Sequence, residues 1–131
     1  MDKRLVKPTL FVFVVWVLLN YVIHEVLLKT AYAATATTWR AEPLIGLIFL
    51  VTLVSAVVFV HIFVTFVSER GVQVGIKYGT IFAIGAGTSF AYGSYAVLNV
   101  PYSMALVWFL GTVIEGAVAG WIVGTLVPEE D

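Results

Sequence analysis

Four long apolar runs alternate with short polar or charged segments along this chain. Each run reaches the length of about 20 residues that a helix needs to cross a bilayer. A proline lies at or just before three of the four expected helix starts, where its missing N–H leaves no helical hydrogen bond unmade. The runs cover residues 8–28, 43–67, 74–98 and 102–127. They predict an all-α fold, a single domain over residues 1–131, formed by an antiparallel bundle of four transmembrane helices.

The segments between the runs are typical of turns and loops at a membrane surface. Residues 29–42 form a polar loop rich in Thr and Ala, and residues 68–71 form a charged turn that ends in glycine. Only residues 99–101, Asn-Val-Pro, separate the last two runs. So short a connection predicts that the last two helices form an antiparallel hairpin.

The composition also indicates a membrane protein. The chain is 61% hydrophobic and 11% charged, whereas soluble domains carry about 25% charged residues. So few charges cannot cover the surface of a soluble protein, and the hydrocarbon of a bilayer must therefore solvate most of the chain. The net charge of −1 argues against nucleic acid as a partner, and the lack of cysteine excludes disulfides and thiol catalysis. We expect an integral membrane protein in contact with membrane lipids.

The basic residues predict the orientation, because Lys and Arg concentrate on the cytoplasmic side of a membrane protein. One side of the predicted bundle carries Lys3, Arg4, Lys7, Arg70 and Lys77, and the other carries Lys29 and Arg40. This bias places both termini in the cytoplasm, in a multi-pass protein of the cell inner (cytoplasmic) membrane. The first apolar run is too long for the core of a usual signal peptide, so we expect an uncleaved helix.

Small residues recur every four positions in the third and fourth runs. One stripe consists of Gly75, Gly79, Ala83, Gly87 and Ala91, and the other of Thr112, Gly116, Gly120 and Gly124. Such stripes let two helix backbones approach closely, so that dispersion and Cα–H···O contacts hold them together. The stripes favour packing within the predicted hairpin, and a contact between two copies of the chain is the alternative.

Every run carries polar residues in its outer half. With a rise of about 1.5 Å per residue, the deepest is Glu115, about 20 Å from the outer boundary. The others in this layer are Asn20, Thr52, Ser55, Thr88, Ser89 and Tyr92, while His24, Glu25 and Tyr95 lie closer to the outer surface. If these side chains face one another, they form a polar pocket that opens outward. Glu115 is then the floor of this pocket, and His24, Glu25 and Tyr95 form its outer mouth.

Glu115 is the one charged residue in an apolar stretch, residues 105–124, that is long enough to cross a bilayer. An intramembrane carboxylate costs a few kcal/mol or more before any partner is found. Two interpretations remain open. In the structural one, a protonated Glu115 donates a hydrogen bond to a backbone carbonyl or to a hydroxyl such as that of Ser55, Thr88 or Ser89. In the functional one, the carboxyl binds a proton or a cationic solute.

The two histidines are the only strong nitrogen ligands for a metal. His24 shares a face of the first helix with Asn20, and its neighbour Glu25 is spaced for an ion pair with Lys29. His61 lies roughly 20 Å from His24 along the membrane normal, so one chain cannot bind a metal or haem through both, since imidazole–metal bonds are about 2 Å long. We expect no metal and no cofactor. The sequence also holds no catalytic triad, phosphate loop or HExxH motif, and we expect no enzyme.

Residues 20–28, Asn-Tyr-Val-Ile-His-Glu-Val-Leu-Leu, are followed by Tyr32 and Arg40, and a Glu-Arg-Gly turn precedes the glycine-rich third run. In these features the chain resembles a group of small bacterial four-helix membrane proteins that have Asn-x-x-Ile-His near the end of the first helix. Glu25 stands where that group has glycine. The resemblance implies the four-helix topology only, because that group has no established function. Small multidrug transporters also have four short helices, but their essential glutamate lies in the first helix, so their function is not carried over.

Three functions are compatible with the sequence. The first is a non-enzymatic accessory or structural subunit of a homo-oligomer or a larger membrane complex, because the loops leave little outside the bilayer to meet other partners. The second is a channel or transporter for protons or a small cation that uses Glu115. The third is binding of a lipid, quinone or pigment between aromatic-rich helices, with Trp16, Phe90, Trp108 and Trp121 as candidate contacts.

Overall fold

The regular elements of the protein are all helical in the computed structural model, which describes residues 2–129. In chain order they are α1 (Lys3–Asn20), the π-helical η1 (Tyr21–Leu27), α2 (Lys29–Ala34), the 3₁₀ turn η2 (Ala36–Thr38), α3 (Ile45–Phe66), α4 (Val72–Gly87), the π-helical η3 (Thr88–Tyr92), α5 (Gly93–Val97) and α6 (Tyr102–Leu126). The all-α prediction is confirmed for this part of the chain.

Three helical segments are long and apolar enough to cross a membrane, namely Lys3–Leu27, Ile45–Phe66 and Tyr102–Leu126. They correspond to the first, second and fourth apolar runs and indicate a membrane-associated protein. The third run, residues 74–98, lies in α4, η3 and α5. It is less hydrophobic than the others because glycine, serine, threonine and tyrosine replace many aliphatic residues.

Two boundaries differ from the prediction. The first helix begins at Lys3, five residues before Pro8, because the Asp2 carboxylate accepts a hydrogen bond from the Arg4 main-chain N–H and so caps the helix. Pro8 therefore lies inside α1. The predicted outer loop, residues 29–42, contains a short helix, α2, and the turn η2, because the main-chain N–H of Tyr32 donates to the carbonyl of Leu28 and helical bonding resumes after η1.

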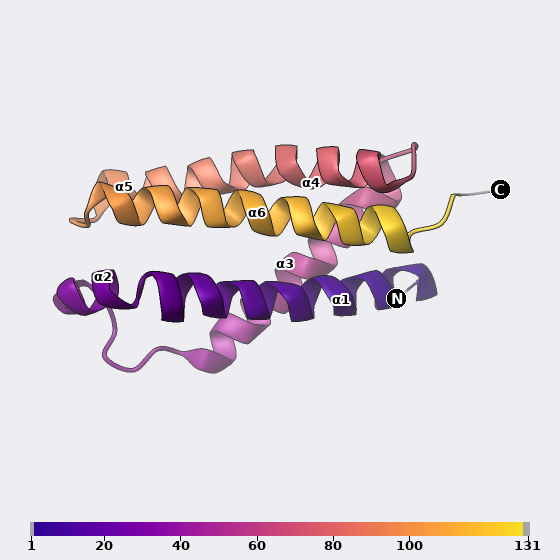
Figure 1. The fold of residues 1–131 in the computed structure, drawn as a ribbon. Coiled ribbons are helices and arrows are strands. Elements are labelled where there is room, and N and C mark those ends of the chain that lie inside the picture. Colours follow the sequence, from indigo (N-terminus) through magenta and orange to yellow (C-terminus); the bar gives the residue numbers. More distant parts are fainter. Residues whose placement is uncertain (1, 130–131) are drawn as a thin grey trace.

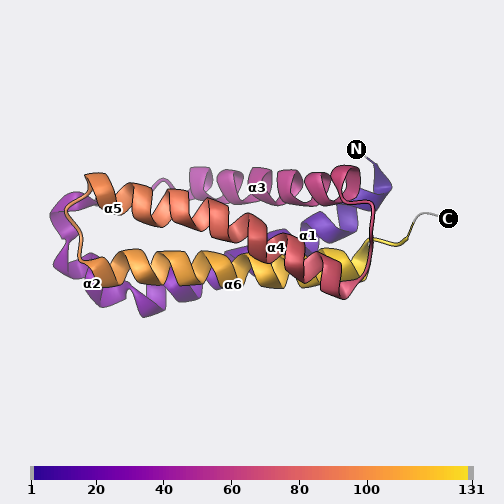
Figure 2. The same ribbon diagram turned by 90° about the horizontal axis from the view of Figure 1, so that it is seen from above.

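The long helices lie roughly along one common direction (Figures 1 and 2). Helices α4 and α6 run side by side, α1 follows the other side of α6, and α3 crosses at a clear tilt, packed mainly against α1. The start of α1 and the end of α6 lie at one end of the molecule, and α2 and α5 lie at the other.

Helices α4 and α6 are in direct backbone contact. A Cβ atom added to Gly79 would collide with the carbonyl oxygen of Gly116, and one added to Gly75 would collide with that of Gly120. Further along, Gly87 faces Thr112. Both small-residue stripes are therefore used within the chain, where the absence of side chains allows the two helices to touch.

An apolar core fills the half of the molecule that contains the start of α1. It is built around Val12 of α1, Phe59 and Phe63 of α3, and Ala119 and Val123 of α6, all with no exposed surface. Ring contacts bind α3 to α4 in this half, where the Tyr78 hydroxyl also donates a hydrogen bond of 2.6 Å to the main-chain oxygen of Phe59. The tilt of α3 is thus fixed at this end.

The other half of α3 is exposed on all sides. Residues 45–51 span nearly two turns, so they cover every face of the helix, and each of them is exposed. Six of the seven carry large apolar side chains, and the remaining one is Gly46. Such a segment requires an apolar solvent, which the hydrocarbon of a bilayer supplies.

The turn between α3 and α4 is held by Arg70. Its guanidinium donates a hydrogen bond of 3.0 Å to the main-chain oxygen of Val64 and lies 5.3 Å from the ring centroid of Phe63. These contacts satisfy a carbonyl at the end of α3 and place a positive charge at the negative end of the helix dipole. Gly71 follows with a φ of 111°, a conformation that favours glycine.

Candidate intramembrane binding site

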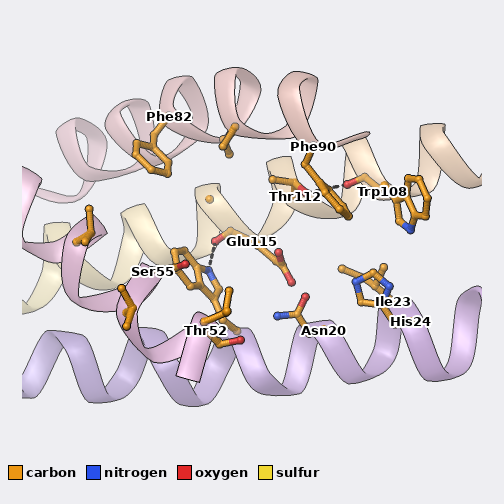
Figure 3. A pocket seen from close by; sticks show the side chains of 17 residues that line it. Asn20, Ile23, His24, Thr52, Ser55, Phe82, Phe90, Trp108, Thr112 and Glu115 are labelled. Atoms are coloured by element: carbon orange, nitrogen blue, oxygen red, sulfur yellow. Dashed lines mark hydrogen bonds between the residues drawn. The ribbon is translucent and has the colours of Figure 1, made fainter. Parts of the chain in front are cut away.

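A cavity of about 520 Å³ lies between α1, α3, α4 and α6, beside the apolar core. Its wall consists of 17 residues from these helices and from the π-helical segments (Figure 3). Most of these side chains are aliphatic or aromatic, with a few polar groups among them. Ligand pockets in proteins commonly have this composition and a volume of about 300–1,000 Å³.

Five of the polar residues singled out in the sequence line this cavity together: Asn20, His24, Thr52, Ser55 and Glu115. They come from α1, η1, α3 and α6, so three of the long helices contribute. Thr112, predicted only as a member of a small-residue stripe, also lines it.

The other polar candidates lie outside the cavity: Thr88, Ser89, Tyr92, Glu25 and Tyr95. The face of α4 and η3 turned to the cavity carries Phe82, Ala83, Ala86 and Phe90, which recur at the three- to four-residue spacing of one helix face. Thr88 and Ser89 fall between these positions and are exposed.

The outlying hydroxyls are satisfied locally. Thr88 donates a hydrogen bond of 2.7 Å to the carbonyl of Ile84, one turn earlier in its own helix. The hydroxyls of Tyr92 and Tyr102 lie 3.1 Å apart, and the ring of Tyr95 packs edge-on against Tyr102. Glu25 is exposed on η1. A similar predicted depth therefore does not bring these residues into the cavity with Glu115.

The carboxyl of Glu115 points into the cavity (Figure 3). Its Oε1 is buried and has no hydrogen-bond partner among residues 2–129. Its main-chain oxygen accepts a hydrogen bond of 2.9 Å from the indole Nε1 of Trp16, which ties α6 to α1 at this level. The side chain thus remains available to a ligand in the cavity.

Asn20 and His24 face Glu115 across the cavity (Figure 3). Side chains on a helix lean toward its N-terminus. The N-terminus of α6 lies at the α2 end of the molecule, so Glu115 leans toward that end, whereas side chains on α1 lean the opposite way. The amide, the imidazole and the carboxyl therefore converge from both directions on one small polar region.

The threonine hydroxyls can act only as acceptors in the cavity. Thr52 donates its proton to the carbonyl of Ile48 at 2.9 Å, and Thr112 donates to the carbonyl of Trp108 at 2.8 Å. Each oxygen keeps lone pairs to accept a hydrogen bond. The donors that the cavity can offer are therefore the Asn20 amide, the His24 ring, the Ser55 hydroxyl and a protonated Glu115.

One end of the cavity is closed. Trp16 lines it and packs edge-on against Phe59, with ring centroids 5.4 Å apart, and Phe59 belongs to the fully buried apolar core. On α3 the core residues Ala56 and Phe59 flank the cavity-lining Val58, and on α6 the core begins three residues after Gly116. Apolar side chains of the core therefore close this end of the cavity.

The opposite end is covered by an aromatic cap, formed by Tyr32, Trp39 and Trp108. Trp39 packs edge-on against both other rings, with centroid distances of 5.2 and 6.0 Å. The Tyr32 hydroxyl accepts a hydrogen bond of 2.8 Å from Trp108 Nε1 and lies 2.7 Å from His24 Nδ1. The predicted outer mouth of the pocket is thus capped where His24 and Trp108 meet.

The open side of the cavity faces laterally, between α3 and α4. Val51, Val54 and Val58 form one edge, and Phe82 and Phe90 form the other. All five are exposed, since α3 diverges from α4 in this half of the molecule. If the long helices cross a bilayer, this side of the cavity faces the hydrocarbon.

Both π-helical segments border the cavity. Ile23 and His24 belong to η1, and Phe90 belongs to η3. A π-helical turn changes the phase of the side chains that follow it, and such turns occur frequently at functional sites. No pattern in the sequence signals these segments, so the direction of His24 was not predictable.

Comparison of the chain with protein-family models, with curated proteins and with solved structures gave no match. Among residues 2–129, no group of three or more His, Cys, Asp or Glu side chains is placed to hold a metal ion. The chemistry that the cavity offers is hydrogen bonding and charge, within walls that are largely aromatic and aliphatic.

Proposed function

We propose that the protein binds one small amphiphilic molecule in this cavity, with the polar group of that molecule at Glu115 and its apolar part between α3 and α4. The observation that carries the proposal is the buried, unpartnered Oε1 of Glu115 in a mostly apolar cavity that opens sideways. A buried polar group without a partner costs about 1–3 kcal/mol, and a ligand that supplies the partner recovers this free energy. The function is binding, without catalysis.

We further propose that α1, α3, α6 and the segment from α4 to α5 all cross the inner membrane as an antiparallel four-helix bundle. The support for the fourth crossing is the close packing of α4 on α6, through backbone contacts at Gly75 and Gly79 and the Thr112 side chain at Gly87, since helices packed along this length reach the same depth. The excess of Lys and Arg on one side supports cytoplasmic termini and an outer position for α2.

The topology can be tested by labelling, because the natural chain contains no cysteine. In spheroplasts, Ala34→Cys is expected to react with a membrane-impermeant maleimide. Ser68→Cys is expected to react only after the membrane is permeabilised. Both positions are exposed, so burial does not bias the comparison. Labelling of Ser68→Cys alone in intact spheroplasts would show the inverted orientation. Labelling of both variants would place positions 34 and 68 on the same side and refute the proposal that α3 crosses the membrane.

Two other functions have less support in the geometry. The glycine stripes, which offered a surface for an oligomer or a larger complex, are used between α4 and α6. The apolar core closes the cavity at one end, which favours a pocket over a channel for protons or cations. Binding of a lipid-soluble molecule is the hypothesis that the cavity and its lateral opening favour.

Filling the cavity should abolish binding. Ala86→Trp places an indole between the walls, and the variant is expected to lose any amphiphile that co-purifies with the natural protein in mild detergent. Ile81→Trp is the matched control, because Ile81 is exposed on α4 and does not line the cavity. Native mass spectrometry with lipid extraction measures the bound mass. Equal retention by both variants, or no bound molecule in the natural protein, would refute the proposal.

A further inference from the structure

We infer that the bound molecule presents a hydrogen-bond acceptor, a carbonyl oxygen, to the Nε2–H of His24, and that Tyr32 and Trp108 fix the imidazole tautomer that makes this possible. The inference rests on the proposed binding function and names the chemistry of the polar group that the cavity takes.

The proton positions follow from the donors available in the aromatic cap. The indole Nε1–H of Trp108 is a donor only, so the Tyr32 oxygen must accept at the 2.8 Å contact. The phenol has one proton to donate, and His24 Nδ1 lies 2.7 Å from the same oxygen. If Tyr32 donates to Nδ1, all three groups are satisfied. The reverse direction would leave the phenol proton without a partner in a half-buried site.

The state of the phenol supports this direction. Burial raises the pKa of the Tyr32 hydroxyl above its ordinary value, although the hydrogen bond from Trp108 partly opposes this shift. Tyr32 is therefore a neutral phenol that keeps its proton near neutral pH. An acceptor role for Nδ1 leaves the single proton of a neutral imidazole on Nε2.

The Nε2 edge of His24 is the edge left for the cavity. His24 is a cavity-lining residue, and its ring lies on the side of Asn20 and Glu115 (Figure 3). The Nδ1 edge is turned to Tyr32. The cap thus converts His24, which could present either a donor or an acceptor, into a fixed donor toward the ligand.

A carbonyl oxygen is the acceptor that suits this donor in a membrane-soluble molecule, since it is uncharged and enters from hydrocarbon at low cost. Two sources share this chemistry, a quinone ring and the acyl ester of a lipid. Asn20 and Glu115 lie beside His24 and can bond further oxygen or hydroxyl groups of the same molecule.

The tautomer is tested first, by ¹⁵N NMR of ring-labelled histidine in lipid nanodiscs. His61→Gln removes the other histidine, which is exposed and remote from the cavity. The expected spectrum shows an unprotonated Nδ1 and a protonated Nε2, and Tyr32→Phe is expected to give a mixture of the two tautomers. A protonated Nδ1 in the protein with intact Tyr32 would overturn the inference.

Binding is tested with three probes: a decyl-substituted benzoquinone, a monoacylglycerol and dodecylamine, whose ammonium group is only a donor. His24→Phe keeps an aromatic ring and removes the donor. The affinity for the carbonyl probe that fits is expected to fall about tenfold, which is the effect of losing one hydrogen bond of about 1.4 kcal/mol. Dodecylamine binding is expected to stay unchanged. If the benzoquinone loses affinity in His24→Phe, the natural ligand is a quinone; if the monoacylglycerol does, it is a lipid ester.

The outcomes distinguish a failure of the inference about His24 from a failure of the proposed binding function. If a carbonyl probe binds equally well to the natural protein and to His24→Phe, the inference about His24 is wrong and the binding function stands. If none of the probes binds and Ala86→Trp changes nothing, the binding function itself is wrong. Thermal unfolding of His24→Phe, compared with the natural protein, shows whether a lost affinity reflects a lost fold.

Discussion

Replacing Gly79 by alanine is expected to force α4 and α6 apart and to lower the free energy of unfolding by about 3 kcal/mol, at the upper end for over-packed sites. The added Cβ would overlap the carbonyl oxygen of Gly116 and come close to the Cα of Gly120. Both are backbone atoms, which cannot rotate away as a flexible side chain can. Unfolding by heat or by titration with a denaturing detergent, starting from a mild detergent, measures the change.

Gly85→Ala is the matched control for this variant. Gly85 lies in the same helix, and a Cβ atom added there meets nothing within 4 Å. Alanine in place of glycine inside a helix is favourable by up to about 1 kcal/mol, so Gly85→Ala should be as stable as the natural protein or slightly more so. Similar losses in both variants would show that the close contact of the two backbones is not what holds α4 to α6.

Phe59→Ala is the substitution in the apolar core with the largest expected effect. The Phe59 side chain has no exposed surface and packs against the rings of Trp16, Tyr78 and Phe82 at centroid distances of 5.4, 4.8 and 5.3 Å. We expect a loss of about 2–3 kcal/mol, below the 3–5 kcal/mol of soluble proteins, because lipid tails are as apolar as a protein core and only packing is lost.

Phe49→Ala, on the same helix, is the control for Phe59→Ala. Phe49 is 46% exposed on the half of α3 that diverges from its neighbours. Phe49→Ala exchanges one lipid-facing apolar side chain for a smaller one, and its stability should stay within about 0.5 kcal/mol of the natural protein. The same denaturation measurements apply to both variants. Equal effects at the two positions would contradict the assignment of Phe59 to a packed core.

The apolar pattern was sufficient to predict most of the fold. It located two of the helices closely, with predicted residues 43–67 and 102–127 against Ile45–Phe66 and Tyr102–Leu126. The glycine spacing correctly indicated that α4 and α6 pack together, because helix contacts in lipid depend on small residues. The apolar pattern did not predict the extension of α1 before Pro8, because a proline beyond the first turn removes a helical hydrogen bond and usually marks a helix start. The Asp2 cap supports the first turn here.

About half of the polar candidates line the cavity, and the reason is geometric. The rise per residue gives the depth of a side chain, but the face it occupies depends on the rotation of each helix. Rotation is normally read from an apolar stripe, and a helix that is apolar all round, such as α3, has none. The π-helical turns shift the phase again near His24 and Phe90. Thr88 and Ser89 therefore lie on a face of their helix that does not line the cavity.

The backbone contact between α4 and α6 also has a mechanical consequence. The backbones touch where Gly75 and Gly79 of α4 meet Gly116 and Gly120 of α6, and the side chains nearby include the small Ala83. Little can repack at this contact, so we expect the two helices to move as a unit. The opposite wall, α3, is anchored only at its Phe59 end and diverges from α4 beyond it. The tilt of α3, fixed at the Phe59 end, therefore sets the width of the cavity and with it the girth of the molecule that fits.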